Sequence, residues 1–183
     1  MTTIALIVAA GRGARMRTET PKQYLTLGGV SVLRRTVMAF LDHPGISGVQ
    51  VVYHPDDDEL YQDAVDGLAL PAPVAGGDTR QGSVRNGLEA LVGRDPTHVL
   101  IHDAARPFVT RNEISNVLAA LNQHAGAISA LPVVDTVKRA DGEGMITATE
   151  SREGLWRALT PQGFDFSAIM AAHREMADQN LTD

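Results

Sequence analysis

The sequence contains no cysteine and few aromatic residues, and each shortage excludes a class of chemistry. Without cysteine, its 183 residues can form no disulfide, no thiolate nucleophile and no cysteine-ligated metal site. Aromatic residues make up 4% of the chain, too few to build stacking platforms for single-stranded nucleic acid. The formal net charge is -6. Because nucleic-acid binding needs a basic surface, this balance argues against a DNA or RNA partner.

Long apolar runs are also missing. The longest, IALIVAA at 4–10, is far shorter than the about 20 residues that a transmembrane helix needs. No basic residue precedes it, as a signal peptide would require. We therefore expect a cytoplasmic protein with no membrane partner. The acidic balance also means that an anionic ligand must be held by local positive charge, because the overall field repels it.

Length and composition predict a single domain with a substantial core. Of the 183 residues, 44% are hydrophobic and 21% are charged, as in ordinary globular proteins. Apolar strand-like runs alternate with helical segments, which is the rhythm of an α/β fold with a doubly wound, mostly parallel sheet. We expect strands at 4–8, 49–53, near 74, at 99–101 and at 127–132, and helices at 32–41, after Pro55, at 80–92 and at 112–123.

One segment departs from this alternation. Residues 136–140 and 145–150 are strand-like and are joined by the turn sequence DGEG at 141–144. The faces of the predicted hairpin are polar, so little in it favours burial in the core. We expect a single domain over residues 1–183 from which a hairpin arm, at about 135–152, stands out.

Neither the acidic residues nor the histidines predict a metal site. The acids at 56–59 follow Pro55 and suit the N-terminus of a helix, where they would be capped and solvated. His98 and His102 lie four residues apart on one strand, but no third ligand is near them in sequence. We therefore expect no metal that is ligated by the protein alone.

The first predicted strand ends in a glycine-rich loop with positive charges. Gly11 and Gly13 permit backbone angles at which successive N–H groups point at an anion, and Arg15 and Lys22 add charge. Ligands of open α/β sheets bind at this carboxyl edge. Met16 stands where the dinucleotide fingerprint needs its third glycine, and the loop lacks the Gly-Lys-Ser/Thr of a Walker motif. The glycines alone leave a tight turn open, whereas the two charges favour a phosphate-binding loop.

Further segments share an order with a known enzyme family. They are AAGRGARM at 9–16 with PKQYL at 21–25, GGDTRQGSVRNGL at 76–88, HDAARPF at 102–108, DTVKR at 135–139 and GLWRALTPQ at 154–162. Together they resemble the 2-C-methyl-D-erythritol 4-phosphate cytidylyltransferases, from residue 4 to the end. The resemblance implies a Rossmann-like nucleotidyltransferase fold. It also implies transfer of CMP from CTP to 2-C-methyl-D-erythritol 4-phosphate, with release of pyrophosphate, in non-mevalonate isoprenoid precursor biosynthesis.

The resemblance also implies a cofactor, a partner and a longer chain. The cofactor is Mg²⁺, held mainly by the phosphates of CTP, and the partner is a second copy that pairs through the hairpin arm. The family continues past a motif like LTD, at 181–183 here, into a strand and helix with a lysine-bearing motif. In some bacteria it continues into a fused cyclodiphosphate synthase domain. We expect those C-terminal elements to be absent from this sequence.

Residue by residue, the resemblance implies two catalytic and several binding roles. Arg15 and Lys22 are expected to stabilise charge around the α-phosphorus. Asp103 is expected to contact the hydroxyls of the sugar phosphate, and Arg106 to act as a phosphate-binding or structural arginine. The nucleotide is expected to contact Ala9, Ala10, Gly11 and Gly13 through its triphosphate, Gly76, Asp78 and Ser83 through cytosine, and Ala104 on the ribose side; the methylerythritol phosphate is expected to contact Thr136, Arg152, Thr160 and Thr182.

These assignments have alternatives. Ser83 as a plain surface serine, Asp103 as a loop cap or a salt-bridge partner of Arg106, and structural threonines would each explain the same residues. For the whole chain, the alternatives are a cytidylyltransferase for another polyol phosphate, such as ribitol 5-phosphate, and a non-catalytic nucleotide-binding protein. Arg15 and Lys22 argue against the last alternative, because a pure binder needs no charge at the α-phosphorus.

Overall fold

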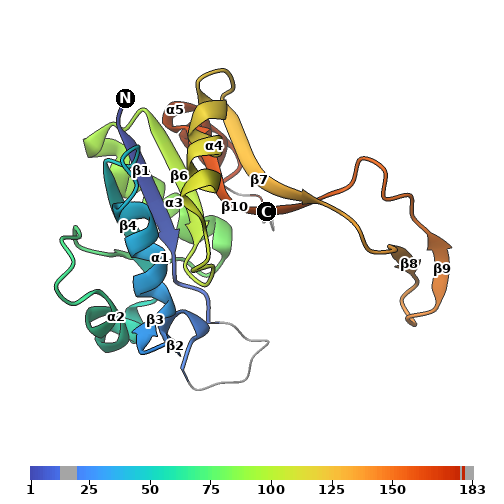
Figure 1. Cartoon of the computed structure of the whole chain (residues 1–183), viewed down its shortest axis with the longest axis horizontal. Coiled ribbons are helices and arrows are strands. Elements are labelled where there is room, and N and C mark those ends of the chain that lie inside the picture. The colour runs from blue at the N-terminus through green and yellow to red at the C-terminus, as the bar shows by residue number, and fades with distance from the viewer. Residues whose placement is uncertain (13–19, 178, 180–183) are drawn as a thin grey trace.

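A six-stranded sheet lies at the centre of the structure, a computed structural model that describes residues 1–12, 20–177 and 179. Its strand order is β5-β4-β1-β6-β10-β7. Strand β10 runs antiparallel to both of its neighbours, and the pairs β5-β4, β4-β1 and β1-β6 are parallel. The predicted doubly wound, mostly parallel sheet is therefore confirmed (Figure 1). The strands are β1 (Thr3–Val8), β4 (Gly48–Tyr53), β5 (Val74–Ala75), β6 (His98–Asp103), β7 (Gly126–Pro132) and β10 (Trp156–Asp165).

Helices cover both faces of this sheet. Side chains of α1, α2 and α4 join one buried apolar cluster, and side chains of α3 and α5 join the other. Side chains of β1 alternate between the two clusters: Ile4 and Leu6 belong to one, and Ala5 and Ile7 to the other. The helices are α1 (Val32–Leu41), α2 (Asp58–Val65), α3 (Arg80–Leu91), α4 (Arg111–Leu121) and α5 (Phe166–Glu175).

Local sequence signals explain where these helices begin. The hydroxyl of Ser31 caps α1 and that of Thr79 caps α3, each by accepting a backbone N–H of the first turn. Thr110 and Glu113 form a reciprocal capping box at α4. Helix α3 also lies unusually close to the sheet, because a Cβ at Gly87 would stand 2.5 Å from a methyl group of Leu6. The start of α3 lies at the carboxyl edge of the strands, where Arg80 donates to Asp103.

The chain folds a strand and a helix that the sequence analysis did not predict. Strand β10 carries Pro161 and Gly163, residues that ordinarily weaken a strand prediction, and its register with β7 shifts between Ala158 and Gln162. It lies between β6 and β7 and leads into α5. It therefore separates β6 from β7 in the sheet.

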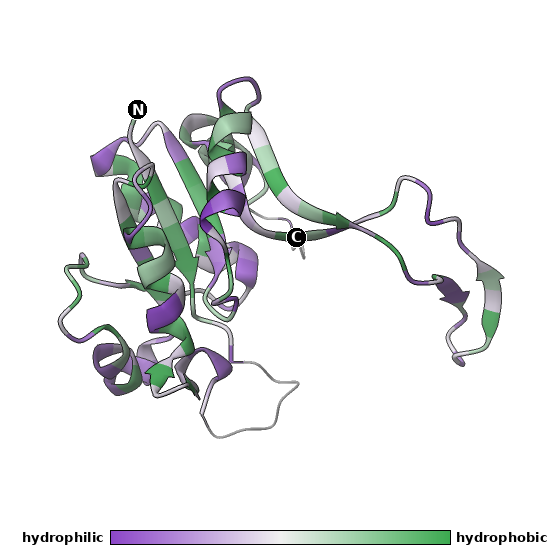
Figure 2. Cartoon of the chain, in the orientation of Figure 1, coloured by the Kyte–Doolittle hydropathy of each residue, from purple (hydrophilic) through white to green (hydrophobic). Residues whose placement is uncertain are grey.

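The predicted hairpin arm stands off the rest of the molecule (Figure 1). Its strands β8 (Lys138–Ala140) and β9 (Ile146–Thr149) pair with each other in an antiparallel, two-stranded sheet. The expectation of polar faces was too simple. Ile146 is 66% exposed, and Val134 and Trp156 at the base of the arm are 69% and 61% exposed. Figure 2 shows hydrophobic colour on β9 as well as on the central strands.

Short elements complete the described part of the chain. Strands β2 (Thr26–Leu27) and β3 (Val30–Ser31) form a small hairpin before α1. Three-residue 3₁₀ turns lie at Lys22–Tyr24, Pro55–Asp57 and Val92–Arg94. No helix within the described residues has the length and apolar character needed to cross a bilayer.

Candidate functional site

The carboxyl ends of the parallel strands bring several predicted residues to one edge of the sheet. Val8 is in register with Asp103, and the N–H of Ala104 donates to the carbonyl of Val8 at 3.0 Å. The N–H of Ala9 donates to the carbonyl of Val52 at 2.7 Å. The loops that follow β1, β4 and β6 therefore start side by side, at the edge where α/β proteins bind ligands.

A buried side chain anchors the loop after β1. Ala9 and Ala10 are buried, whereas Gly11 is exposed. Gln23, from the PKQYL segment, is buried and donates from Nε2 to the carbonyl oxygens of Ala9 at 2.6 Å and of Gly11 at 3.1 Å. Lys22 precedes Gln23 in the same 3₁₀ turn and is exposed. The predicted residues Gly13, Arg15 and Thr182 lie outside the described residues.

Arg12 ties the same loop to the start of α2. Its guanidinium lies 2.6 Å from a carboxylate oxygen of Asp56 and 3.3 Å from one of Asp57. The prediction that the acids at 56–59 are all solvated is wrong for Asp57, which is 3% exposed. A carboxylate is buried here because an arginine from the glycine-rich loop compensates its charge.

The segment after β5 packs directly on the loop after β1. A Cβ at Gly76 would lie 2.3 Å from the Cβ of Ala10, so only glycine fits there. Ser83 is 3% exposed, and the alternative of a surface serine is therefore wrong. Its hydroxyl accepts from the N–H of Gly77 at 3.1 Å and donates to the carbonyl of Gly77 at 3.3 Å. Ser83 shapes this segment, and the neighbouring Asp78 is exposed to solvent.

Asp103 ends β6 between two arginines. Arg80 contacts one carboxylate oxygen at 3.3 Å and Arg106 the other at 2.9 Å. Burial by itself raises the pKa of Asp103, but the hydrogen bond from Arg106 and the charge of Arg80 outweigh it, so the pKa lies below its ordinary value. The salt bridge to Arg106 that the sequence left open is present. Arg80 was missed, because its partner lies 23 residues away in sequence and on another element.

The residues around Asp103 fix its backbone. The N–H of Asp103 donates to the hydroxyl of Thr160 at 3.3 Å, and the hydroxyl of Thr36 donates to the carbonyl of Ala104 at 2.8 Å. Burial lowers the pKa of His102, whose Nε2 donates to the carbonyl of Arg106 at 3.0 Å. Thr160 and Ala104 are thus brought to the strand edge, as buried supports of the Asp103 turn.

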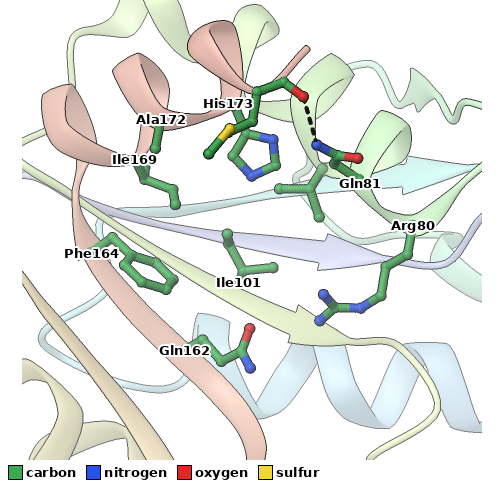
Figure 3. Close-up of a pocket in the computed structure, with 10 residues that line it drawn as sticks. Arg80, Gln81, Ile101, Gln162, Phe164, Ile169, Ala172 and His173 are labelled. Carbon is green, nitrogen blue, oxygen red and sulfur yellow. Dashed lines mark hydrogen bonds between the residues drawn. The ribbon is translucent and has the colours of Figure 1, made fainter. Parts of the chain in front are cut away.

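Arg80 also lines a cavity. It has a volume of about 230 Å³ and lies between α3, α5, β6 and β10. Figure 3 shows Arg80 and Gln162 at one end of it and Ile169 and His173 of α5 at the other. Arg80 therefore lines this cavity and also contacts the carboxylate of Asp103.

Two predicted substrate contacts are not brought to the strand edge. Thr136 is exposed near the foot of the arm, and Arg152 donates to the carbonyl of Val134. The arm extends sideways from the sheet, to the right in Figure 1. Within the residues that the structure describes, one copy therefore does not unite these two residues with Asp103.

Asp103 should make the stability of the fold depend on pH. Because its pKa is lower in the folded chain, the stabilisation by Arg80 and Arg106 is fully present above about pH 4 and is lost as pH falls through the folded-state pKa. We expect Asp103→Asn to lower the Tm at pH 7, and the difference from wild type to shrink towards pH 3. The control is Asp63→Asn, an exposed carboxylate on α2. A difference for Asp103→Asn that stays constant from pH 7 to pH 3 would contradict this reading.

Within the described ranges no group of three or more histidine, aspartate or glutamate side chains is placed to hold a metal ion. At the strand edge, both carboxylate oxygens of Asp103 already accept from arginines. A cation at this edge would therefore compete with both arginines for the carboxylate of Asp103.

Comparisons with known proteins agree on one family. A family model described as 2-C-methyl-D-erythritol 4-phosphate cytidylyltransferase matches residues 3–183. The chain is 55% identical over 180 residues to the "Bifunctional enzyme IspD/IspF" of Rhodospirillum rubrum, covering 98% of this chain and 47% of that protein. It is 49% identical over 181 residues to the protein of the same name from Paramagnetospirillum magneticum, covering 99% and 47%. The chain thus spans about half the length of the curated relatives it matches.

Solved structures extend the same similarity to the fold. The 2-C-methyl-D-erythritol 4-phosphate cytidylyltransferase of Thermus thermophilus is 34% identical, with a TM-score of 0.77 over 100% of this chain and 80% of that one. The 4-diphosphocytidyl-2C-methyl-D-erythritol synthase of Anaerococcus prevotii is 29% identical, with a TM-score of 0.84 over 100% of this chain and 78% of that one. The arrangement of sheet and helices described above is therefore shared with these enzymes.

Proposed function

The chain belongs to the 2-C-methyl-D-erythritol 4-phosphate cytidylyltransferase family, and on that premise we propose that it transfers CMP from CTP to 2-C-methyl-D-erythritol 4-phosphate. The observation that carries the proposal is the meeting of three segments at one strand edge: the loop after β1, the Gly76–Ser83 segment and Asp103. Two of these segments are candidates for the triphosphate and the base, and the third is a candidate for the acceptor.

In the proposed reaction, a phosphate oxygen of methylerythritol phosphate forms a bond to the α-phosphorus of CTP. The bond from that phosphorus to the oxygen bridging it to the β-phosphorus breaks, and pyrophosphate leaves with the electron pair. A phosphate monoester is already mostly dianionic at neutral pH, so no general base is required. The remaining task is to hold two anions together and to neutralise the charge that builds up between them.

Each part of the site has a share of that task. The backbone of residues 9–11 is proposed to contact the triphosphate, and Lys22 and Arg15 to stabilise charge at the α-phosphorus and the leaving group. Gly76 and Ser83 are proposed to build the shape that admits cytosine, with Asp78 beside it. Asp103, held by Arg80 and Arg106, is proposed to contact the hydroxyls of the acceptor.

Mg²⁺ is proposed to accompany the nucleotide. The site fits such a role, because Asp103 is occupied by arginines and the cation readily keeps water and phosphate oxygens as ligands. When bound, the ion would supply positive charge between the phosphates. The residues of the chain would then hold the nucleotide that carries it.

We also propose that the enzyme is a homodimer formed through the arm. An isolated two-stranded hairpin is at best marginally stable in water, and Ile146, Val134 and Trp156 expose apolar surface on it and at its base. A two-fold dimer would let each arm make the same contact with the other copy. Arg152 and Thr136 would then reach the acceptor site of the partner, which a single copy leaves without them.

The test is pyrophosphate release with a panel of nucleotides and polyol phosphates. We expect turnover with CTP and 2-C-methyl-D-erythritol 4-phosphate, and a kcat/KM for UTP lower by ~10²-fold or more, because UTP mismatches donors and acceptors built for cytosine. Equal kcat/KM values for CTP and UTP would refute the base assignment. If ribitol 5-phosphate is turned over and 2-C-methyl-D-erythritol 4-phosphate is not, the proposed acceptor is wrong. If CTP binds but no pyrophosphate is released, the chain is a nucleotide-binding protein.

A further inference from the structure

Gln23 is a buried amide whose side-chain nitrogen donates to the glycine-rich loop. Its side chain is 2% exposed, and its two N–H groups face the carbonyl oxygens of Ala9 and Gly11, at 2.6 and 3.1 Å from Nε2. These carbonyls come from a part of the chain 14 and 12 residues earlier. A buried amide with two donors and two acceptors at these distances defines the orientation of both peptide groups.

Peptide geometry converts that orientation into a prediction about N–H groups. In a planar trans peptide the carbonyl of one residue and the N–H of the next point in opposite directions. The carbonyl of Ala9 faces Gln23, so the N–H of Ala10 faces away from it. In the same way the N–H of Arg12 faces away because the carbonyl of Gly11 faces Gln23. Within the part of the chain that the structure describes, neither N–H has a hydrogen-bond acceptor.

We propose that Gln23 is a positioning residue for triphosphate binding. Gln23 donates hydrogen bonds to two carbonyls of the loop. The N–H groups of Ala10 and Arg12 therefore point away from Gln23, where they can donate to phosphate oxygens. The loop is then organised before the ligand arrives, which lowers the entropic cost of binding. The proposal rests on the proposed function for the identity of the ligand, a nucleoside triphosphate.

The same turn links this tether to the cationic side chain. Lys22 and Gln23 are consecutive in the 3₁₀ turn, which is closed by the N–H of Leu25 on the carbonyl of Lys22 at 3.3 Å. Gln23 points into the protein and Lys22 is exposed. Fixing Gln23 on the loop therefore also fixes the backbone from which the charge of Lys22 extends. A glutamate at position 23 would place a carboxylate, which repels both carbonyl oxygens, where the amide now donates. An asparagine is one methylene shorter, so its amide would not reach both carbonyls at these distances.

The chain contains a matched control for a buried glutamine. Gln50 on β4 is 4% exposed, and its Nε2 also donates to two backbone carbonyls, of Val51 at 3.3 Å and of Ala72 at 2.8 Å. Neither carbonyl belongs to the glycine-rich loop. Gln23→Met and Gln50→Met therefore remove the same number of donors from the interior and fill the same volume. We expect both to lower the Tm, whereas Gln23→Met alone should affect the loop.

The binding experiment uses inorganic tripolyphosphate with Mg²⁺, measured by titration calorimetry, and cytidine as a second probe. We expect Gln23→Met to raise the Kd for tripolyphosphate ~10-fold or more, the effect of losing hydrogen bonds that preorganise the loop. The Kd for cytidine should stay within about 2-fold, and Gln50→Met should bind both probes like wild type. Equal tripolyphosphate affinity for Gln23→Met and wild type would overturn the proposal, as would absence of tripolyphosphate binding by wild type.

A second measurement needs no variant. The backbone amide resonances of Ala10 and Arg12 in the wild-type chain should shift on addition of tripolyphosphate, and unchanged resonances at saturation would overturn the proposal even if Gln23→Met failed to fold. The outcome is separable from that of the transferase reaction. A chain that binds tripolyphosphate through Gln23 but releases no pyrophosphate would refute the transferase proposal only. A chain that turns over CTP with Gln23→Met unchanged in tripolyphosphate affinity would refute the tether only.

Discussion

Replacement of Lys22 by alanine should lower kcat for cytidylyl transfer by ~10²-fold or more, while the KM for CTP changes much less. The reason is that negative charge accumulates around the α-phosphorus as the new bond forms, and a cation placed there gains strength in the transition state. Lys22 is exposed at the start of the turn that Gln23 anchors to the glycine-rich loop. In a chain with a formal net charge of -6, the local charge has no support from the overall field.

The control for Lys22→Ala is Arg94→Ala. Arg94 is exposed in the turn that precedes β6, so it lies at the opposite end of that strand from Asp103. Both substitutions remove one positive charge, and the overall field changes equally in the two variants. We expect Arg94→Ala to keep the wild-type kcat. If Lys22→Ala also keeps kcat and only raises the KM for CTP, Lys22 is a simple binding residue and its catalytic assignment is wrong.

The sequence predicted the parallel half of the fold well, because buried parallel strands and capped helices leave local signals. The run at 4–8 is apolar on both faces, and β1 does feed both core clusters. Strand β10 left no such signal. Pro161 and Gly163 interrupt its pattern, and its antiparallel position between β6 and β7 depends on contacts with distant segments. Local periodicity contains no information about which distant strands will pair with β10.

The same distinction separates the predicted site residues from the missed ones. Glycines at a strand end and motif residues such as Asp103 can be read along the chain. Arg80 and Gln23 could not be assigned, because each acts on a group that is distant in sequence: Arg80 on Asp103, and Gln23 on Ala9 and Gly11. Arginines and glutamines are common on surfaces, and only the structure shows that Arg80 contacts Asp103 and that Gln23 is buried against the loop.

The largest gain of activity is expected from mixing two inactive variants. In the proposed dimer, Lys22 acts in the site of its own chain and Arg152 in the site of the partner. Lys22→Ala and Arg152→Ala should each be nearly inactive alone. Random exchange of subunits makes about half of the dimers mixed. In each mixed dimer one site carries both defects and the other carries neither, so the mixture should recover roughly a quarter of wild-type activity, by the same symmetry.

A second mixture supplies the control. The structure brings Asp103 to the same strand edge as the glycine-rich loop of its own chain, since Asp103 is in register with Val8. Lys22→Ala and Asp103→Asn therefore share one site, and in a mixed dimer every site keeps one defect. We expect this mixture to remain inactive after the same exchange. Recovery in it would show that activity returns for reasons other than the sharing of sites.

The position of Arg152 makes the outcome decisive. In a single chain its guanidinium donates to the carbonyl of Val134, at the base of an arm that extends sideways from the sheet (Figure 1). For Arg152 to serve its own site the arm would have to fold back over the sheet, whereas a partner could receive it without such a change. If the mixture of Lys22→Ala and Arg152→Ala stays inactive although mixed dimers are detected by native mass spectrometry, Arg152 acts within its own chain. The arm would then have to close over its own strand edge, and its exposed apolar residues would need that edge as their partner.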